Sequence, residues 1–318
     1  MSLPEEALYG KKNAAYDQAA KKVLSQKKIL AFILKRTVKE FENESIQDIM
    51  TKYIEGKPDI NQVPVYPDET NLGIEAIHGD NAEDGSISEG MVRYDILFRA
   101  LAPKTNDPIT LIINIEAQNK SNPGYTLLKR ATYYASRLIS SQRGREFHGD
   151  EYDNIKKVYT IWICMNAPKE AGNSINRYQM TEERLHGRYH ARQDNYDLII
   201  VIMLYLGNRK TQDSLMEMLR IIFKERASAY VKKKQLEEEY GIRLTEDETK
   251  ELSNMCNLSE GVFEEGIRIG KKGEHERTMV DNINSLMKTM GLSLSQAMHA
   301  LQIPQDEASR YQKLIKKH

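Results

Sequence analysis

Cysteine is scarce in this sequence, which has two, Cys164 and Cys256. They lie far apart and form no cluster with metal-ligand spacing, which argues against a disulfide scaffold or a cysteine-ligated metal site. A reduced, cytosolic protein is the simplest explanation, so we expect a cytoplasmic location.

Long apolar runs and an excess of one charge are also missing. The longest apolar run, residues 198–206, is too short to cross a bilayer, and no signal peptide is visible, so we expect no membrane partner. Because 46 Lys and Arg balance 46 Asp and Glu, binding to nucleic acid would depend on local patches. The lysine-rich segment 1–24 is either a solvated arm or helix, or a strip that follows a phosphate backbone.

Residues 92–118 have the pattern of a β-hairpin. Both ends are rich in β-branched, aromatic and long aliphatic residues, and the middle is polar with two prolines. A turn centred between Thr105 and Asn106 would place Asp95 opposite Glu116. Two carboxylates facing each other across a hairpin have Cβ atoms about 5 Å apart and repel unless a cation lies between them. A divalent metal ion is the usual remedy, so the hairpin predicts a metal site.

An aspartate on one strand followed by Glu-x-Gln at the end of the next resembles the PD-(D/E)XK nuclease superfamily; here the residues are Asp95, Glu116 and Gln118. The sequence is most similar to the branch described as recombination-promoting nucleases or PD-(D/E)XK family transposases. The resemblance covers residues 25–207, and its segments are EGMVRYDILFRA, LIINIEAQ, NPGYTLLKRATYYASRLIS and KVYTIWICMN. It implies a restriction-endonuclease-like core and cleavage of DNA.

The resemblance also implies a set of metal ligands: the carboxylates of Asp95 and Glu116 and the backbone carbonyl of Ala117. Ligands that supply only oxygen favour Mg²⁺ or Mn²⁺ over zinc. Such an ion would polarise the phosphodiester and lower the pKa of the attacking water. Many relatives carry lysine at the position of Gln118. Lysine can supply charge to the transition state, whereas glutamine can only orient the water or hydrogen-bond a phosphate.

Three further carboxylates are candidates for the same site. Members of the superfamily often bring one from the helix before the sheet, and Glu40, on the flank of the apolar stripe of the predicted helix 27–54, is the first choice. Glu44, one turn later, is the second. The alternative for both is an ordinary solvated helix acid. Glu89 precedes Asp95 by six residues, where relatives often have a glutamate.

Apolar spacing predicts a helix over residues 125–142 with one broad apolar side. Arg130, Tyr134 and Arg137 recur on one side of it. Arginine forks suit phosphate and a phenol adds a hydrogen bond, so we expect these residues to bind substrate phosphates near the metal. The alternative is a set of helix-surface cations beside a packed tyrosine.

The remaining periodicity predicts an α/β fold with a mixed β-sheet flanked by helices. Residues 158–165 and 196–206 are apolar runs typical of buried strands, and 72–77 is a further candidate strand. Residues 78–90 are expected to form a polar loop, and 166–193 to be irregular.

We divide the chain into a basic N-terminal arm (1–24), a nuclease-like α/β domain (25–230) and a helical C-terminal appendage (231–318). The last part of the appendage is expected to be a helix, a turn containing Pro304 and a helix. It is either a helix-turn-helix that enters a DNA groove or a packing or oligomerising element, which leaves a homo-oligomer open.

Three functional hypotheses follow. The first is a metal-dependent DNA endonuclease of bacterial type, linked to recombination or transposition. The second is a catalytically weak or inactive DNA-binding protein that kept the nuclease fold. The third is a structural or interaction protein with a vestigial site.

Overall fold

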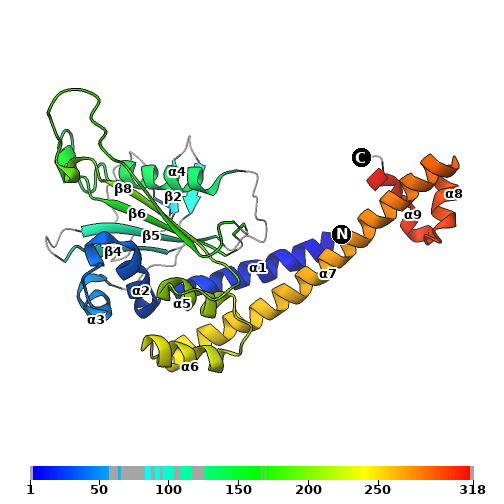
Figure 1. Cartoon of the computed structure of the whole chain (residues 1–318), viewed down its shortest axis with the longest axis horizontal. Coiled ribbons are helices and arrows are strands. Elements are labelled where there is room, and N and C mark those ends of the chain that lie inside the picture. Colours follow the sequence, from blue (N-terminus) through cyan, green and yellow to red (C-terminus); the bar gives the residue numbers. More distant parts are fainter. Residues whose placement is uncertain are drawn as a thin grey trace. The chain divides into compact units, whose positions relative to one another are not determined.

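The computed structural model describes residues 3–56, 64–65, 83–86, 90–93, 96–103, 108–116, 125–165, 167–168 and 170–315. The chain forms two compact units. The larger comprises residues 16–256 and contains the sheets, and the smaller combines residues 1–15 with 257–318 and is helical. Figure 1 labels the elements of both units.

A five-stranded sheet forms the centre of the larger unit (Figure 1). Its strands are β4 (Ile96–Leu101), β5 (Pro108–Glu116), β6 (Val158–Cys164), β7 (Ser174–Gln179) and β8 (Ile199–Tyr205), in the order β4-β5-β6-β8-β7. The neighbours β5, β6 and β8 are parallel, whereas β4 and β7 pair antiparallel at the two edges. This confirms a mixed α/β fold.

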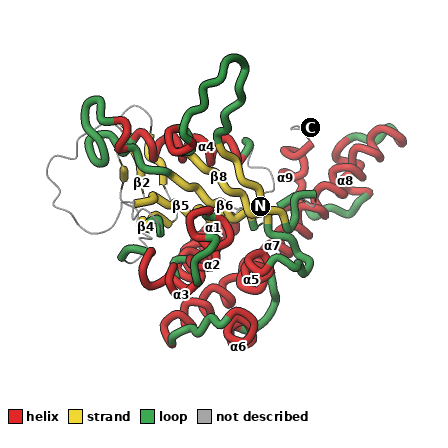
Figure 2. The backbone as a smooth tube through the Cα atoms, turned by 60° about the vertical axis from the view of Figure 1, so that its left-hand side comes forward, coloured by secondary structure: helices red, strands yellow, loops and turns green. Residues whose placement is uncertain are grey.

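Helices lie on both faces of this sheet (Figures 1 and 2). On one face is α4 (Leu127–Ser140), and on the other are α2 (Lys27–Thr37) and α5 (Ser214–Phe223). Because α4 connects the parallel strands β5 and β6, it runs back across the sheet in the opposite direction. The other helical elements are α1 (Leu3–Leu24), η1 (Lys39–Phe41), α3 (Ile46–Asp48), η2 (Ile49–Tyr53), η3 (Tyr152–Asn154), η4 (Gln193–Asn195), α6 (Ala229–Tyr240) and α7 (Glu246–Met290).

The central strand β6 explains why this layered arrangement is stable. All seven of its residues are buried, as expected for a parallel strand covered on both faces. Trp162 and Cys164 belong to a buried cluster with Tyr134 of α4, whereas Ile161 and Ile163 alternate with them along the strand. The whole buried cluster on the α4 side consists of Leu97, Ala131, Tyr134, Ala135, Leu138, Val158, Trp162, Cys164, Val201 and Met203.

The expected hairpin is present as β4 and β5, but its register differs from the sequence prediction. Leu97 pairs with Ile112, whereas the predicted turn would have paired it with Asn114. The predicted register was therefore wrong by two residues. A shift of two leaves the alternation of faces unchanged, because side chains repeat with period two along a strand.

Two regions without an apolar pattern also form strands. A second, three-stranded sheet consists of β1 (Pro64–Val65), β2 (Glu83–Ser86) and β3 (Gly90–Arg93), and β2 falls within the expected polar loop 78–90. The edge strand β7 lies within the segment expected to be irregular, and its residues Asn176 to Gln179 are exposed. Backbone pairing with a neighbour makes these strands, and that pairing leaves no periodicity in the sequence. The strand predicted at 72–77 lies outside the described residues.

In the smaller unit, α8 (Leu294–Ala300) and α9 (Gln305–Ile315) pack with the end of α7 around a core of Val280, Ile283, Ala297, Met298 and Tyr311. Ser293 caps α8 through a capping box with Gln296. The order of helix, turn and helix agrees with the prediction from the sequence. Insertion of this segment into a DNA groove stays a prediction. No helix of the described residues, α7 included, has the length and apolar composition needed to cross a bilayer.

Replacing Ile161 by alanine tests the role of β6 as the packed centre of the fold. Ile161 is fully buried and pairs with Ile113 and Ile202, so Ile161→Ala should lower the free energy of unfolding by about 2–5 kcal/mol through the cavity it leaves. Urea denaturation measures the change, with the exposed Val231→Ala as control. Equal, small effects of both variants would contradict the packing described.

Candidate active site

The three parallel strands end together at one edge of the sheet, which we call the carboxyl edge. There Glu116 of β5 pairs with Cys164 of β6, Cys164 pairs with Tyr205 of β8, and Tyr205 pairs with Ser174 of β7. Open α/β sheets bind their ligands outside the carboxyl ends of the parallel strands. The carboxyl edge is therefore the expected location of a ligand-binding site.

On the face of the sheet that is covered by α4, the row of buried residues of β6 continues to the carboxyl edge. Cys164 belongs to the cluster beneath α4, and Glu116 is its register partner. The preceding pair of the same parity is Asn114 with Trp162, and Trp162 lies in the same cluster. The backbone of Glu116 thus occupies a register position that continues the row of α4-facing residues.

Arg130 of α4 lies among three aromatic rings near this edge. Its guanidinium carbon is 5.0 Å from the ring centre of Tyr134, 5.6 Å from that of Trp162 and 5.9 Å from that of Tyr125. It donates hydrogen bonds from Nε (3.2 Å) and Nη2 (2.9 Å) to Tyr134 Oη, and from Nη1 (2.9 Å) to Tyr125 Oη. Trp162 belongs to β6, so the rings hold the arginine between α4 and β6 and bring Arg130 and Tyr134 together.

Arg137 and Tyr134 were predicted to bind substrate phosphates, which needs exposed side chains, but both are buried. Arg137 is 4% exposed and Tyr134 8% exposed. Arg137 donates a hydrogen bond from Nη1 to Tyr133 Oη at 3.0 Å. The phenols that reach the surface of α4 are Tyr125 and Tyr133, which the sequence analysis did not select. The sequence signal that could have identified them is a tyrosine four or five residues before an arginine.

The predicted metal ligands fall largely outside the part of the chain that can be described. Asp95, Ala117, Gln118 and Glu89 lie outside the described residues, and of Glu116 only the backbone is described. Within the described part, no group of three or more His, Cys, Asp or Glu side chains could hold a metal ion. The predicted donors are two carboxylates and a carbonyl, and this all-oxygen set fits Mg²⁺ or Mn²⁺.

Glu40 is not brought to the carboxyl edge. Its Oε2 accepts a hydrogen bond from Tyr159 Oη (2.5 Å), and its Oε1 is 3.0 Å from Lys157 Nζ, which also contacts Asp197 Oδ2 at 2.8 Å. Tyr159 is five residues before Cys164 on β6, which is about 17 Å along a strand and of opposite parity. Glu40 therefore connects η1 to the opposite end and the opposite face of the sheet.

Glu44 has local contacts. Its Oε2 accepts a hydrogen bond from Tyr53 Oη at 3.4 Å, and its backbone carbonyl accepts one from Lys35 Nζ. Both contacts lie within the helical segment that precedes the sheet. The structure does not bring Glu44 to the position of Glu116.

The charges around Glu40 shift its pKa. Burial raises the pKa of the carboxyl, but the hydrogen bonds from Tyr159 and Lys157 outweigh burial, and the pKa lies below the ordinary value of 4.5. Burial likewise lowers the pKa of Lys157, but its bonds to Asp197 and Glu40 outweigh burial and raise it. The folded state therefore favours the ionised pair.

Glu40→Gln should remove a pH-dependent part of the stability. A folded-state pKa below the unfolded value stabilises the protein above about pH 4.5 and loses this effect as the pH falls through the folded pKa. We expect the variant to be less stable at pH 7 by about 1–2 kcal/mol and to lose stability less steeply between pH 5 and pH 3, as measured by urea denaturation. The exposed Glu183→Gln is the control. An unchanged acid slope would contradict the interpretation.

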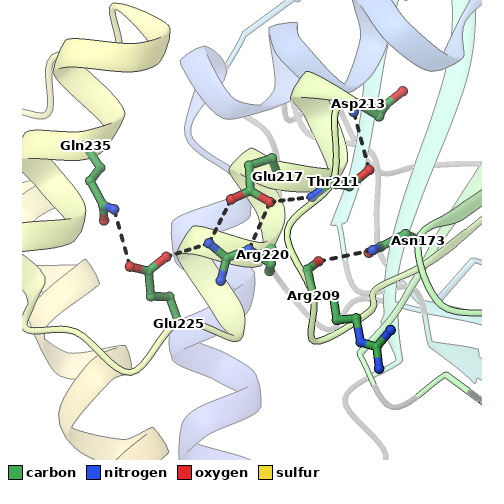
Figure 3. Close-up of polar contacts among 8 residues, drawn as sticks. All are labelled: Asn173, Arg209, Thr211, Asp213, Glu217, Arg220, Glu225 and Gln235. Atoms are coloured by element: carbon green, nitrogen blue, oxygen red, sulfur yellow. Dashed lines mark hydrogen bonds and ion pairs between the residues drawn. The ribbon is translucent and has the colours of Figure 1, made fainter.

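A polar network holds the loop that follows β8 at the carboxyl edge (Figure 3). Arg220 of α5 bonds Glu217 through Nε (2.9 Å) and Nη2 (2.7 Å), and Nη2 also bonds Glu225 at 2.7 Å. Glu217 accepts a further bond from the backbone N–H of Thr211, and Glu225 accepts one from Gln235 of α6. Each of the three charged groups has a partner within the network, which fixes the loop.

Asn173 fastens the other end of the same loop. Its Oδ1 accepts a hydrogen bond from Gly207 N (3.1 Å) and its Nδ2 donates one to the carbonyl of Arg209 (3.1 Å; Figure 3). Asn173 has a φ of +63°, a conformation that asparagine tolerates better than most residues. A Cβ at position 207 would lie 2.6 Å from Asn173 Oδ1. A side chain at 207 would therefore displace the amide of Asn173 from its hydrogen bonds, and sequence reasoning did not identify this contact.

A double-mutant cycle tests this contact. Gly207→Ala should destabilise the protein by about 1–3 kcal/mol through the clash, and Asn173→Gly, which tolerates the positive φ, by about 1–2 kcal/mol through two lost hydrogen bonds. The double variant should lose less than the sum by at least about 0.5 kcal/mol, because the clashing atom is gone. Additive losses in urea denaturation would contradict the geometry.

Comparison with known proteins agrees with the arrangement of these elements. A family model described as PD-(D/E)XK nuclease family transposase matches residues 104–288. This range includes Glu116, Gln118 and the α4 residues, and begins after Asp95. No curated protein and no solved structure matches the chain. Since the family match spans more than half of the sequence, the chain belongs to the PD-(D/E)XK nuclease family transposases.

Proposed function

We propose that this protein is a metal-dependent DNA endonuclease that hydrolyses phosphodiester bonds in recombination or transposition. The observation that carries the proposal is the pairing of Glu116 with Cys164 at the carboxyl edge, on the row of residues that faces α4. Membership of a nuclease family supports DNA as the substrate. Together they support a site between the end of β5 and the start of α4.

The hairpin register supports Asp95 as the second carboxylate. Leu97 is buried in the cluster beneath α4 and pairs with Ile112. Odd-numbered residues of β4 and even-numbered residues of β5 therefore share one face. Asp95 has the parity of Leu97 in the sequence, and Glu116 has the parity of Ile112, so we propose that both carboxylates belong to the face that carries Leu97.

In this proposal the metal is held by Asp95, Glu116 and the carbonyl of Ala117. A bound Mg²⁺ or Mn²⁺ supplies Lewis acidity to the phosphodiester. Gln118 orients the attacking water or hydrogen-bonds a phosphate oxygen, and Glu89 is a further carboxylate for the same site. Glu40 and Glu44 are left with structural roles, because their partners lie elsewhere in the fold.

Cations near the edge support a phosphate-bearing substrate. Arg130 is held against β6 by its aromatic neighbours Tyr134 and Trp162. Arg209 and Lys210 are exposed on the loop after β8, and Asn173 bonds the carbonyl of Arg209. Local charge of this kind provides the attraction to nucleic acid that a balanced net charge cannot supply.

A plasmid-nicking assay with Mg²⁺ or Mn²⁺ tests the proposal. Asp95→Ala and Glu116→Ala should each reduce the nicking rate by about 100-fold or more, because each removes a ligand of the metal ion that stabilises the transition state. Gln118→Lys should retain or raise the rate. The matched control is Glu183→Ala, an exposed carboxylate on the loop between β7 and β8.

The outcomes separate the hypotheses. Nicking that persists in both alanine variants would overturn the assigned site. A wild-type protein that binds DNA and the metal but does not nick would support a DNA-binding protein with a weak or inactive site, as Gln118 in place of lysine allows. Calorimetry of Mg²⁺ and Mn²⁺ binding to wild type and Glu116→Ala gives a readout of the metal site that does not depend on activity.

A further inference from the structure

Two tyrosines stand out on the exposed side of α4. Tyr125, just before the helix, is 47% exposed, and Tyr133, nearly two turns into it, is 45% exposed. The neighbouring tyrosine, Tyr134, is buried against Trp162, with a distance of 5.5 Å between ring centres. The cluster beneath α4 includes Tyr134, and neither Tyr125 nor Tyr133 belongs to it.

Each exposed tyrosine is matched with an arginine in the same way. Arg130 donates to Tyr125 Oη at 2.9 Å and lies 5.9 Å from its ring centre. Arg137 donates to Tyr133 Oη at 3.0 Å and lies 5.8 Å from its ring centre. The two pairs make similar contacts, although Tyr125 precedes its arginine by five residues and Tyr133 precedes its arginine by four.

The arginines determine what the phenols can offer. A phenol oxygen that accepts a hydrogen bond from guanidinium keeps its own O–H to donate outward. The same contact fixes the orientation of a ring that is about half exposed, so binding a ligand costs little side-chain entropy. Lys129, Thr132 and Ser136 are exposed on the same helix. Thr132 and Ser136 donate their hydroxyls to carbonyls of the helix. The surface thus combines flat aromatic rings, their phenolic hydroxyls and the cation of Lys129.

This combination fits an unpaired strand of nucleic acid. Unpaired bases stack on aromatic side chains, and a neighbouring backbone is bound by cations and hydroxyl donors. A duplex keeps its bases stacked on each other and cannot use the rings in this way. Arg130 contacts both the exposed Tyr125 and the buried Trp162 of β6, so this surface is continuous with the packing of α4 on the sheet.

We propose that Tyr125 and Tyr133, oriented by Arg130 and Arg137, form a stacking platform for unpaired bases of DNA. The substrate class at this site is therefore DNA with a single-stranded segment, such as an overhang, a flap or an opened strand. The inference rests on the proposed function for its link to cleavage, but the platform itself binds without metal or hydrolysis.

Binding measured in EDTA tests the platform separately from catalysis. Full-length protein is titrated against a labelled single-stranded oligonucleotide, a blunt duplex of the same sequence, and an abasic strand of the same length. We expect the single strand to bind more tightly than both other probes. Tyr125→Leu and Tyr133→Leu should each weaken its binding by about 5- to 150-fold, whereas Tyr125→Phe and Tyr133→Phe should lose much less.

The controls make the result specific. Tyr189→Leu removes an exposed tyrosine from the loop between β7 and β8 and should leave binding unchanged. Thermal denaturation of all variants checks that the fold is kept. The platform would be overturned if the leucine variants bound the single strand as well as wild type does. Equal affinity for the abasic strand or no binding of DNA would also overturn it. So would binding of a protein partner in place of DNA. Nicking without a single-strand preference would overturn the platform alone, and single-strand binding without nicking would overturn only the nuclease assignment.

Discussion

The packing of Trp162 against α4 is the contact on which the rest of the site depends. Trp162 is fully buried in the central strand β6. Its ring packs against the ring of Tyr134, and the guanidinium of Arg130 lies over it. A large rigid ring at this position sets where α4 lies over β6 and β8. Because Arg130 is held by the same rings, its position follows from the hydrophobic packing and not from a charge partner alone.

The two faces of the sheet have different polar chemistry. On the α4 side, arginines are combined with phenols and leave hydroxyl groups and rings at the surface. On the other side, Lys157 lies between Glu40 and Asp197, and Tyr159 completes the group. These contacts connect the helical segment before the sheet to β6 and to the segment before β8. This difference is why Glu40, the expected third carboxylate, is better explained as a structural residue.

The sequence predicts the central elements well because their burial leaves a periodic trace. The apolar runs at β6 and β8 and the spacing in α4 mark strands and a helix without further information. The hairpin was predicted with its faces correct and its register wrong by two residues, since alternation specifies parity but not the exact pairing. The polar strands β2 and β7 were missed because backbone pairing with a neighbour, not side-chain burial, creates them.

By itself the sequence determined the order of segments that marks the family, the parity with which residues of β4 and β5 share a face, and the helical spacing of arginine and tyrosine. Each of these is a local property, set by neighbours a few residues away. The tertiary structure alone decided that Tyr134 and Arg137 face inward while Tyr125 and Tyr133 face solvent, that Glu40 lies at the far end of β6, and that Asn173 meets Gly207. These features depend on which distant segments pack together, and a one-dimensional pattern carries no record of that packing.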